Sequence, residues 1–289
     1  MAINQLGKAY DKLTNFITEC SDAAKEFETG MANVQKTTNM SDEELEKFAD
    51  TLKDLSERIP IFARGLADIA EKAGQLGIAT KDLEEFTETM AMMGVSTDLT
   101  AVEAAENLAQ VAAVTGMTSD QYSRLGSSIV ALGNNFATGE RSIVQFTQRI
   151  AGAASNVGMT EAEMVALATA ISSLGIRADA GGTALQSLIG KLESAVATGD
   201  KLEQWARVCG VSTEELARIW KSDAATAIQL FIKGLGNLDE SYTTVLKDLG
   251  IGEQRIIRTV TSLANAEEKT NLLTRALDMS KTALSSKER

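Results

Sequence analysis

Glycines recur between segments that are rich in helix-forming residues. Beyond Pro60, the only proline, helix-like segments end at a glycine, an apolar residue follows, and Ser or Thr then opens the next segment. Glycine readily adopts the left-handed conformation that ends helices, and the apolar residue after it packs on the last turn. The pattern therefore predicts helices joined in pairs by tight turns. The predicted ends are Gly77-Ile78, Gly94-Val95, Gly116-Met117, Gly158-Met159 and Gly210-Val211.

Capping residues mark where the helices begin. In Ser41–Glu44 and Thr160–Glu163, the hydroxyl of the first residue can accept a hydrogen bond from the amide three residues later. The glutamate carboxylate can in return accept a hydrogen bond from the amide of the first residue. No window alternates apolar and polar residues convincingly, so no strand is predicted. We expect an all-α protein in which a long N-terminal helix precedes a bundle of about ten helices of roughly 10 to 20 residues. Further predicted caps are Thr80, Thr100, Thr118 and Ser212.

The first helix carries a heptad-like seam from Leu6 to Val34. Its members alternate four and three residues apart, as the a and d positions of a coiled coil do. The seam can pack on the body of the protein, on a copy of itself or on another partner. Because Cys20 lies on it, we expect a small buried side chain there rather than a reactive thiol. The members are Leu6, Tyr10, Leu13, Ile17, Cys20, Ala24, Phe27, Met31 and Val34.

Two regions are predicted from these patterns. Residues 1–58 form an N-terminal helical arm that carries the seam, and residues 59–289 form a compact α-helical core domain. The chain ends in the polar run Ser285–Arg289 without a capping glycine. We expect the sequence to be a piece of a longer protein.

The composition removes most kinds of reactive centre. The 289 residues include no histidine and two cysteines, which excludes Ser-His pairs, Cys-His pairs and the usual zinc sites. A net charge of -12 argues against nucleic-acid binding, which requires clustered Lys and Arg. No apolar window reaches the length of about 18 residues that a membrane span needs. We predict no catalytic, cofactor-binding or metal-binding residues and no cofactor.

The remaining chemical candidates have simpler explanations. Adjacent carboxylates point about 100° apart on a helix, so they are predicted to cap first turns rather than to act as an acid/base pair. Leu192 follows Gly190-Lys191, which rules out a phosphate-binding loop. Core or interface roles are expected for Trp205 and Trp220. The methionines are expected to fill the core, with an adaptable contact surface as the alternative. These sets are Glu43-Glu44, Glu84-Glu85 and Glu214-Glu215, and Met90, Met92 and Met93.

Several segments, in this order, resemble the conserved core of phage tail tape measure proteins of the TP901 type. They span about residues 27 to 190. Gly181 and Gln186 depart from the family pattern, which often has alanine and arginine there. The segments are Phe27–Val34, Ile69–Ile78, Leu83–Thr87, Ala101–Ala105, Gly175-Ile176 and Gly181–Leu185.

The resemblance implies a structural protein that lies in the lumen of the phage tail in several copies and sets the tail length. It implies contacts with the tail tube protein, tail assembly chaperones and tail-tip or baseplate proteins, and a passage through the host cytoplasm during assembly. Two alternatives are a muralytic enzyme of the tail tip and a stand-alone helical adaptor. A continuous helix of 289 residues would reach about 430 Å. Because glycines interrupt this chain, we instead expect a compact bundle outside the rod-like part.

One stretch, Gly181–Ala184, is predicted to be a special structural site. Its small residues let two helices approach closely or let the backbone turn sharply. A contact point for the tube or a chaperone is the alternative.

Overall fold

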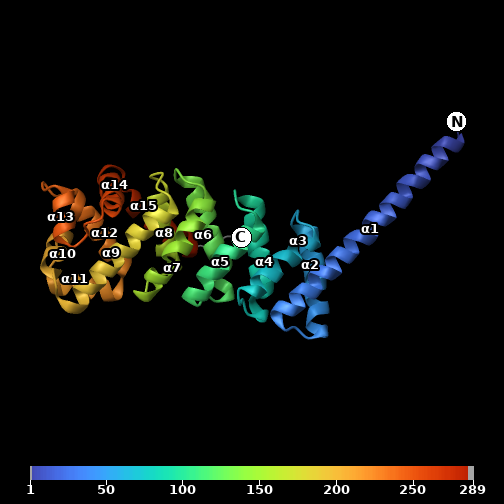
Figure 1. Ribbon diagram of the computed structural model, residues 1–289, viewed down its shortest axis with the longest axis horizontal. Coiled ribbons are helices and arrows are strands. Elements are labelled where there is room, and N and C mark those ends of the chain that lie inside the picture. The colour runs from blue at the N-terminus through green and yellow to red at the C-terminus, as the bar shows by residue number, and fades with distance from the viewer. Residues whose placement is uncertain (1, 286–289) are drawn as a thin grey trace. The chain divides into compact units, whose positions relative to one another are not determined.

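The computed structural model describes the backbone of residues 2–285 and the side chains of residues 12–118 and 121–283. These residues form helices joined by turns, with no strand among them (Figure 1). The all-α prediction is confirmed. The first helix, α1, is a single element of 37 residues, Ala2–Thr38. After it come α2 Asp42–Arg58, α3 Ala63–Gln75, the 3-10 turn η1 Thr80–Asp82, α4 Leu83–Ser96, α5 Ala101–Thr115, α6 Ser119–Asn135, α7 Glu140–Asn156, α8 Glu161–Ser172, α9 Ala178–Thr198, α10 Leu202–Cys209, α11 Thr213–Ser222, α12 Ala224–Gly236, α13 Tyr242–Asp248, α14 Gln254–Thr270 and α15 Leu272–Ser285.

More helices follow α1 than the sequence predicts. The described residues contain fourteen of them, where about ten are expected. Several are short: α10 has 8 residues and α13 has 7. A helix of two turns is shorter than the window in which apolar periodicity can be recognised, so these elements were not resolved from the sequence.

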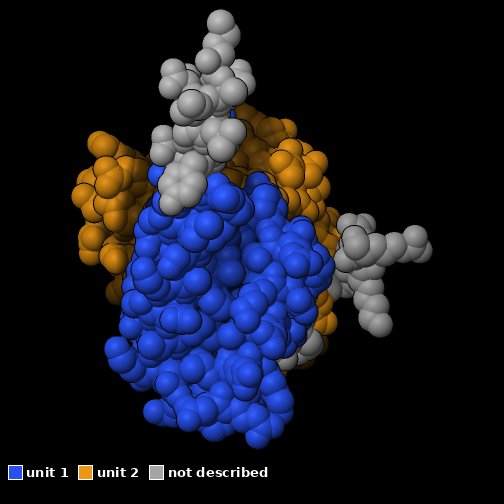
Figure 2. All heavy atoms as spheres, turned by 90° about the vertical axis from the view of Figure 1, so that its right-hand side faces the viewer, with its two compact units in different colours: residues 1–95, 101–109 blue, residues 96–100, 110–289 orange. Residues whose placement is uncertain are grey.

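Contacts between Cα atoms divide the chain into two compact units, which Figure 2 colours separately. Unit 1 comprises residues 1–95 and 101–109, and unit 2 comprises residues 96–100 and 110–289. Each unit has its own buried apolar side chains. The sequence predicts a boundary between residues 58 and 59 that separates a helical arm from a compact core domain. This boundary stays a prediction.

Most of the predicted glycine turns are confirmed. Gly158 has φ +75°, and the amide of Met159 donates to the carbonyl oxygen of Ala154 at 3.0 Å. The Met159 side chain is buried, so the apolar residue packs back on the helix that has just ended. Gly77 and Gly210 end their helices with the same hydrogen bond from the following residue. Gly116 also has a positive φ.

One predicted helix end and one predicted cap are wrong. Gly94 lies inside α4 rather than at its end. A Cβ on Gly94 would lie 2.6 Å from the backbone nitrogen of Ala101, so glycine permits a close approach within unit 1 instead of ending a helix. Thr80 does not cap α4, because it is the first residue of η1 and its hydroxyl donates to the carbonyl oxygen of Thr38 at 3.1 Å.

The predicted capping boxes form as expected. The Ser41 hydroxyl accepts from the Glu44 amide, and the Glu44 carboxylate accepts from the Ser41 amide at 2.9 Å. Thr160 and Glu163 repeat this arrangement at the start of α8. The other confirmed caps are Thr118, which forms a box with Gln121, and Ser212, which accepts from the Glu215 amide at 3.1 Å.

Helix α8 is the centre of unit 2. All of its residues from Ala162 to Ser172 are buried, and it contacts α6, α7 and α15. The C-terminal helix α15 is fixed there by polar groups as well: the buried Ser280 hydroxyl donates to the carbonyl oxygen of Ala162 at 2.7 Å. Helix α15 thus returns to the middle of the unit from the far end of the chain.

The predicted core residues are mostly inside. Trp205 is buried, and its ring lies 4.6 Å from that of Phe231, centroid to centroid. Trp220 is also buried, with its indole nitrogen donating to Glu193. Among the methionines of α4, Met90 and Met93 are buried, whereas Met92 is exposed. Core filling therefore explains two of the three methionines.

Candidate interaction surface

Residues 12–26 of α1 have their side chains in solvent on every face. All residues from 12 to 26 are exposed, and we name this segment the α1 arm. Figure 1 shows α1 extending away from its neighbours α2 and α3 in unit 1. Three large apolar side chains of the arm are more than half exposed: Leu13 at 58%, Phe16 at 62% and Ile17 at 60%. The arm therefore presents apolar surface that its own unit does not cover.

The C-terminal part of the same helix is packed. Met31 and Val34 are buried, and α1 lies against α3. Gly30 permits this contact, because a Cβ at that position would lie 3.0 Å from the Cβ of Ala67. The guanidinium of Arg64 donates to the carbonyl oxygen of Glu26 at 2.9 Å, at the point where the contact begins.

The seam is therefore divided. Phe27 is half-buried, Met31 and Val34 are covered by unit 1, and Leu13, Ile17, Cys20 and Ala24 are exposed. The side chains of Leu6 and Tyr10 lie outside the described residues. The prediction that Cys20 is buried is wrong for the single chain, because none of the described residues of unit 1 covers it. The periodicity indicated an apolar stripe correctly but carried no information on what covers it.

The predicted structural site at Gly181 and Gly182 is a close helix contact. Both glycines lie in the first turns of α9, with ordinary helical backbone, and both are buried. A Cβ on Gly181 would overlap the ring of Phe146 and lie 2.8 Å from Cγ2 of Ile171. A Cβ on Gly182 would overlap the side chain of Arg149 in α7. The glycines therefore let α9 pack against α7.

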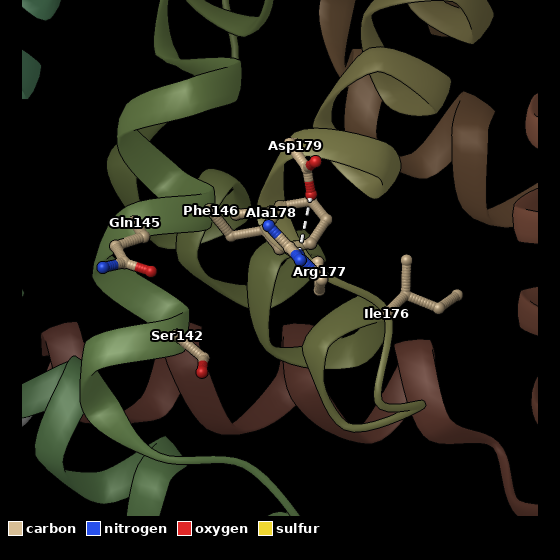
Figure 3. A pocket seen from close by; sticks show the side chains of 7 residues that line it. All are labelled: Ser142, Gln145, Phe146, Ile176, Arg177, Ala178 and Asp179. Atoms are coloured by element: carbon tan, nitrogen blue, oxygen red, sulfur yellow. Dashed lines mark ion pairs between the residues drawn. The ribbon is translucent and has the colours of Figure 1, made fainter.

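A hollow of about 300 Å³ lies beside this contact in unit 2 (Figure 3). Ser142, Gln145 and Phe146 of α7 line one side, and residues 176–179 line the other. The Arg177 guanidinium and the Asp179 carboxylate pair at 3.4 Å, and both side chains are largely exposed. An exposed pair of this kind contributes little to stability. The side chains that line the hollow come from the place where α7 meets the start of α9. Their polar groups do not point to a common centre where a substrate atom could react.

The paired carboxylates act as predicted, at helix starts. The hydrogen bond from the Ser41 amide lowers the pKa of Glu44 below its usual value. The Arg218 guanidinium, 2.5 Å from Glu215, lowers the pKa of that carboxyl. Both glutamates therefore remain charged at neutral pH in the first turns of α2 and α11, where the helix dipole favours negative charge.

Two described glutamates are buried: Glu163, which the sequence identified only as a helix cap, and Glu267, which was not singled out. Glu267 is buried, and its carboxylate accepts from the amides of Leu273 and Thr274, the latter at 3.2 Å, at the start of α15. The buried Glu163 lies 3.5 Å from the Lys281 ammonium. The carboxylates satisfy amides and a cation at helix ends, so they are structural groups.

Within the described residues, no group of three or more Cys, Asp or Glu side chains could hold a metal ion. In the same part of the chain, none of the helices combines the length and the apolar character of a bilayer span. The strongest candidate for function is a surface for protein contacts, the α1 arm, because Leu13, Phe16 and Ile17 are more than half exposed there.

Comparison with known proteins decides the family. The family described as "Phage-related minor tail protein" matches residues 49–250, which is more than half of the chain. The chain belongs to this family of phage tail proteins. Its membership confirms the resemblance recognised from the sequence motifs.

A curated relative is described as "Probable tape measure protein" and comes from Halomonas phage phiHAP-1. It is 28% identical to the chain over 228 residues, which cover 74% of the chain and 26% of the relative. This minor tail family member thus spans about a quarter of the length of the relative that it matches. No solved structure matches the chain described here.

Proposed function

We propose that the chain is a structural, non-enzymatic part of a tape measure protein that helps to set the length of a phage tail. The match of residues 49–250 to the minor tail family carries this proposal, and the similarity to the Halomonas phage protein supports the tape measure role. The all-helical fold is consistent with it, because helices supply length at about 1.5 Å per residue.

The proposed partners and location follow from that role. We propose that the protein lies in the tail lumen of the virion, after assembly in the host cytoplasm, in contact with the tail tube protein, assembly chaperones and tail-tip or baseplate proteins. Self-association through the exposed part of the Leu6–Val34 seam is part of the proposal, because unit 1 already covers Met31 and Val34. The exposed apolar side chains of the α1 arm support it.

Two parts of the chain are proposed to contribute differently to length. The compact units are proposed to lie outside the rod-like part of the full protein, since their helices turn back at glycines. Helix α1 is proposed to add length along the tail, because it is 37 residues long without a turn.

Deletion of the encoding gene from its phage tests the role, with particles examined by electron microscopy. Loss of tails of uniform length, restored by the gene supplied in trans, is expected. Normal tails in the deletion strain would overturn the proposal.

An insertion tests the two contributions. Four added heptads that continue the seam of α1 should lengthen the tail by about 42 Å. A flexible insertion of equal length in the 237–241 loop of unit 2 serves as the matched control and should leave the tail length unchanged. Equal lengthening by both insertions would contradict the division of roles.

Absence of peptidoglycan cleavage is also expected. The glutamates of the predicted pairs at Glu44 and Glu215 serve as helix caps and ion-pair partners, which supports a structural role. A clearing assay on purified cell walls measures this directly, with lysozyme as the positive control. Clearing by the purified chain would overturn the non-enzymatic assignment.

A further inference from the structure

Two lysine side chains of unit 2 converge on a single glycine. Lys191 belongs to α9, Lys201 stands directly before α10, and Gly250 follows α13 (Figure 1). A Cβ on Gly250 would lie 3.6 Å from the ammonium nitrogen of Lys201 and 3.7 Å from that of Lys191. Apart from the two residues that flank Gly250 in the chain, no other described residue has an atom within 4 Å of that point. Because Gly250 is exposed, the two positive charges face one open position.

Neither ammonium group has a counter-ion within the described part of the chain. Lys191 makes no hydrogen bond or ion pair there, and the one partner of Lys201 is the carbonyl oxygen of Asp248, at 2.7 Å. Acidic side chains are not scarce, since the chain holds 40 Asp and Glu against 28 Lys and Arg. Two like charges that lie close together repel each other. An anion bound between the two lysines would remove this repulsion.

The end of α13 explains only part of this arrangement. The helix dipole favours positive charge at a C-terminal end, and Lys201 donates to the carbonyl oxygen of Asp248 there. An ammonium group carries three N–H donors. The remaining donors of Lys201, and every donor of Lys191, are therefore available to water or to a ligand.

Lys201 also has an unusual backbone conformation. Its φ is +58°, and the other non-glycine residues with positive φ in the described chain are Asn39 and Asn271. Asparagine tolerates left-handed backbone, whereas lysine rarely adopts it. Unfavourable conformations of this kind occur preferentially where a side chain must be held in one place. The backbone of Lys201 thus supports a positioned ammonium group.

We propose that Lys191, Lys201 and the turn at Gly250 form a binding site for a phosphate group, either the free ion or a phosphate monoester of a small molecule. The phosphate oxygens would accept hydrogen bonds from both ammonium groups. Gly250 keeps the position open, because any side chain there would project toward the two lysines. The bound group would connect α9, the start of α10 and the turn after α13.

The pairing of two cations favours phosphate over a single carboxylate. A phosphate monoester carries close to two negative charges, spread over three oxygens, so it can balance both lysines. Lysine is also a common phosphate ligand in proteins. The site differs from the phosphate-binding loop that the sequence excludes at Gly190-Lys191. Such a loop is built from consecutive residues, whereas this site is assembled from three separate segments.

Phosphorus NMR of inorganic phosphate tests the site. The purified full chain is added in steps while sodium chloride keeps the ionic strength constant. Saturable broadening of the phosphate signal is expected. Lys191→Gln should weaken binding by about tenfold, because it removes one charge-assisted contact.

Two further variants separate binding from folding and from net charge. Lys191→Arg keeps the positive charge and should retain binding. Lys221→Gln removes an exposed positive charge from α11 and is the matched control, which should bind phosphate as the unmodified chain does. Because Lys191 is exposed and has no partner among the described residues, its variants should keep the melting temperature of the unmodified chain.

The same titration with adenosine monophosphate distinguishes the two sources of the phosphate group. Broadening of the inorganic phosphate signal assigns the site to the free ion, and broadening of the nucleotide signal alone assigns it to a monoester. Absence of saturable broadening with both probes, or equal binding by Lys191→Gln and Lys221→Gln, would overturn the proposal. Either result leaves the gene-deletion test of the tape measure role standing.

Discussion

Two helices of this protein place similar apolar residues in opposite environments. Every residue of α8 from Ala162 to Ser172 is buried, whereas every residue of the α1 arm is exposed. Capped turns at Thr160 and Gly175 bracket α8, so the chain returns on either side and α7 and α15 cover it. Helix α1 has no turn in 37 residues, so little of the chain returns along it. Helix α8 is apolar along most of its length and is bracketed by turns, whereas α1 is more polar and has no turn, so apolar content and turn spacing both distinguish the buried helix from the exposed one.

The two cysteines give the largest contrast between the arm and unit 2. Burial raises the pKa of the Cys209 thiol to about 12. At about pH 8 only about one Cys209 in ten thousand is then a thiolate, the reactive form. In dilute solution we expect iodoacetamide to label exposed Cys20 and to spare Cys209 until denaturant is added, as measured by peptide mass spectrometry. Equal labelling of both thiols would mean that α10 unfolds locally with ease and that Cys209 is no better protected from solvent than Cys20.

Truncation of one apolar side chain in each helix tests the contrast in stability. Leu167→Ala in α8 should lower the free energy of unfolding by about 2 to 5 kcal/mol, because it leaves a cavity in the core. Ile17→Ala in the arm should change it by less than about 0.5 kcal/mol in dilute solution. Chemical denaturation followed by circular dichroism measures both values. A comparable loss in the two variants would show that the arm is packed in the single chain.

Two glycines inside helices also lie in opposite environments, one in close contact with a neighbouring helix and one in open space. A Cβ on Gly234 in α12 would overlap the carbonyl oxygen of Val208, so Gly234→Ala should cost about 1 to 3 kcal/mol. Gly190 in α9 has no atom near its missing Cβ. The matched control Gly190→Ala should therefore stabilise the protein by about 0.5 to 1 kcal/mol. Thermal unfolding that ranks the two variants in the opposite order would contradict the close approach of α10 and α12.

The smallest effect is expected from a helix start in unit 1. The folded-state pKa of Glu44 is lowered, so its contribution to stability is present above the unfolded-state pKa and is lost as pH falls through the folded-state value. Glu44→Gln should remove this part of the acid sensitivity of α2, measured as melting temperature between about pH 7 and about pH 3. The exposed Glu46→Gln in the same helix is the control. Identical pH profiles for both variants would count against the capping box.

Features set by neighbouring residues could be predicted from the sequence. The boxes at Ser41 and Thr160 and the helix ends at Gly158 and Gly210 depend on hydrogen bonds within a few residues, and they form as expected. Asn271 has φ +50° and ends α14, and the tolerance of Asn for left-handed backbone is a signal that was overlooked.

Features set by tertiary contacts could not be predicted in this way. Gly94 is explained by its approach to Ala101 and not by a turn. Whether Cys20 is covered depends on a partner that a single sequence does not specify. Buried Glu267 is acceptable only because the start of α15 comes to its carboxylate. Sequence periodicity therefore located the candidate surface, and the structure was needed to show which half of it is open.

Hydrogen exchange of the purified chain, measured by mass spectrometry as a function of protein concentration, tests the central claim most directly. Amides of residues 12–26 should exchange rapidly in dilute protein and become protected as concentration rises, while those of α8 remain protected throughout. Protection of residues 12–26 that is independent of concentration, or rapid exchange in α8, would contradict a self-packed bundle with an arm completed by other copies.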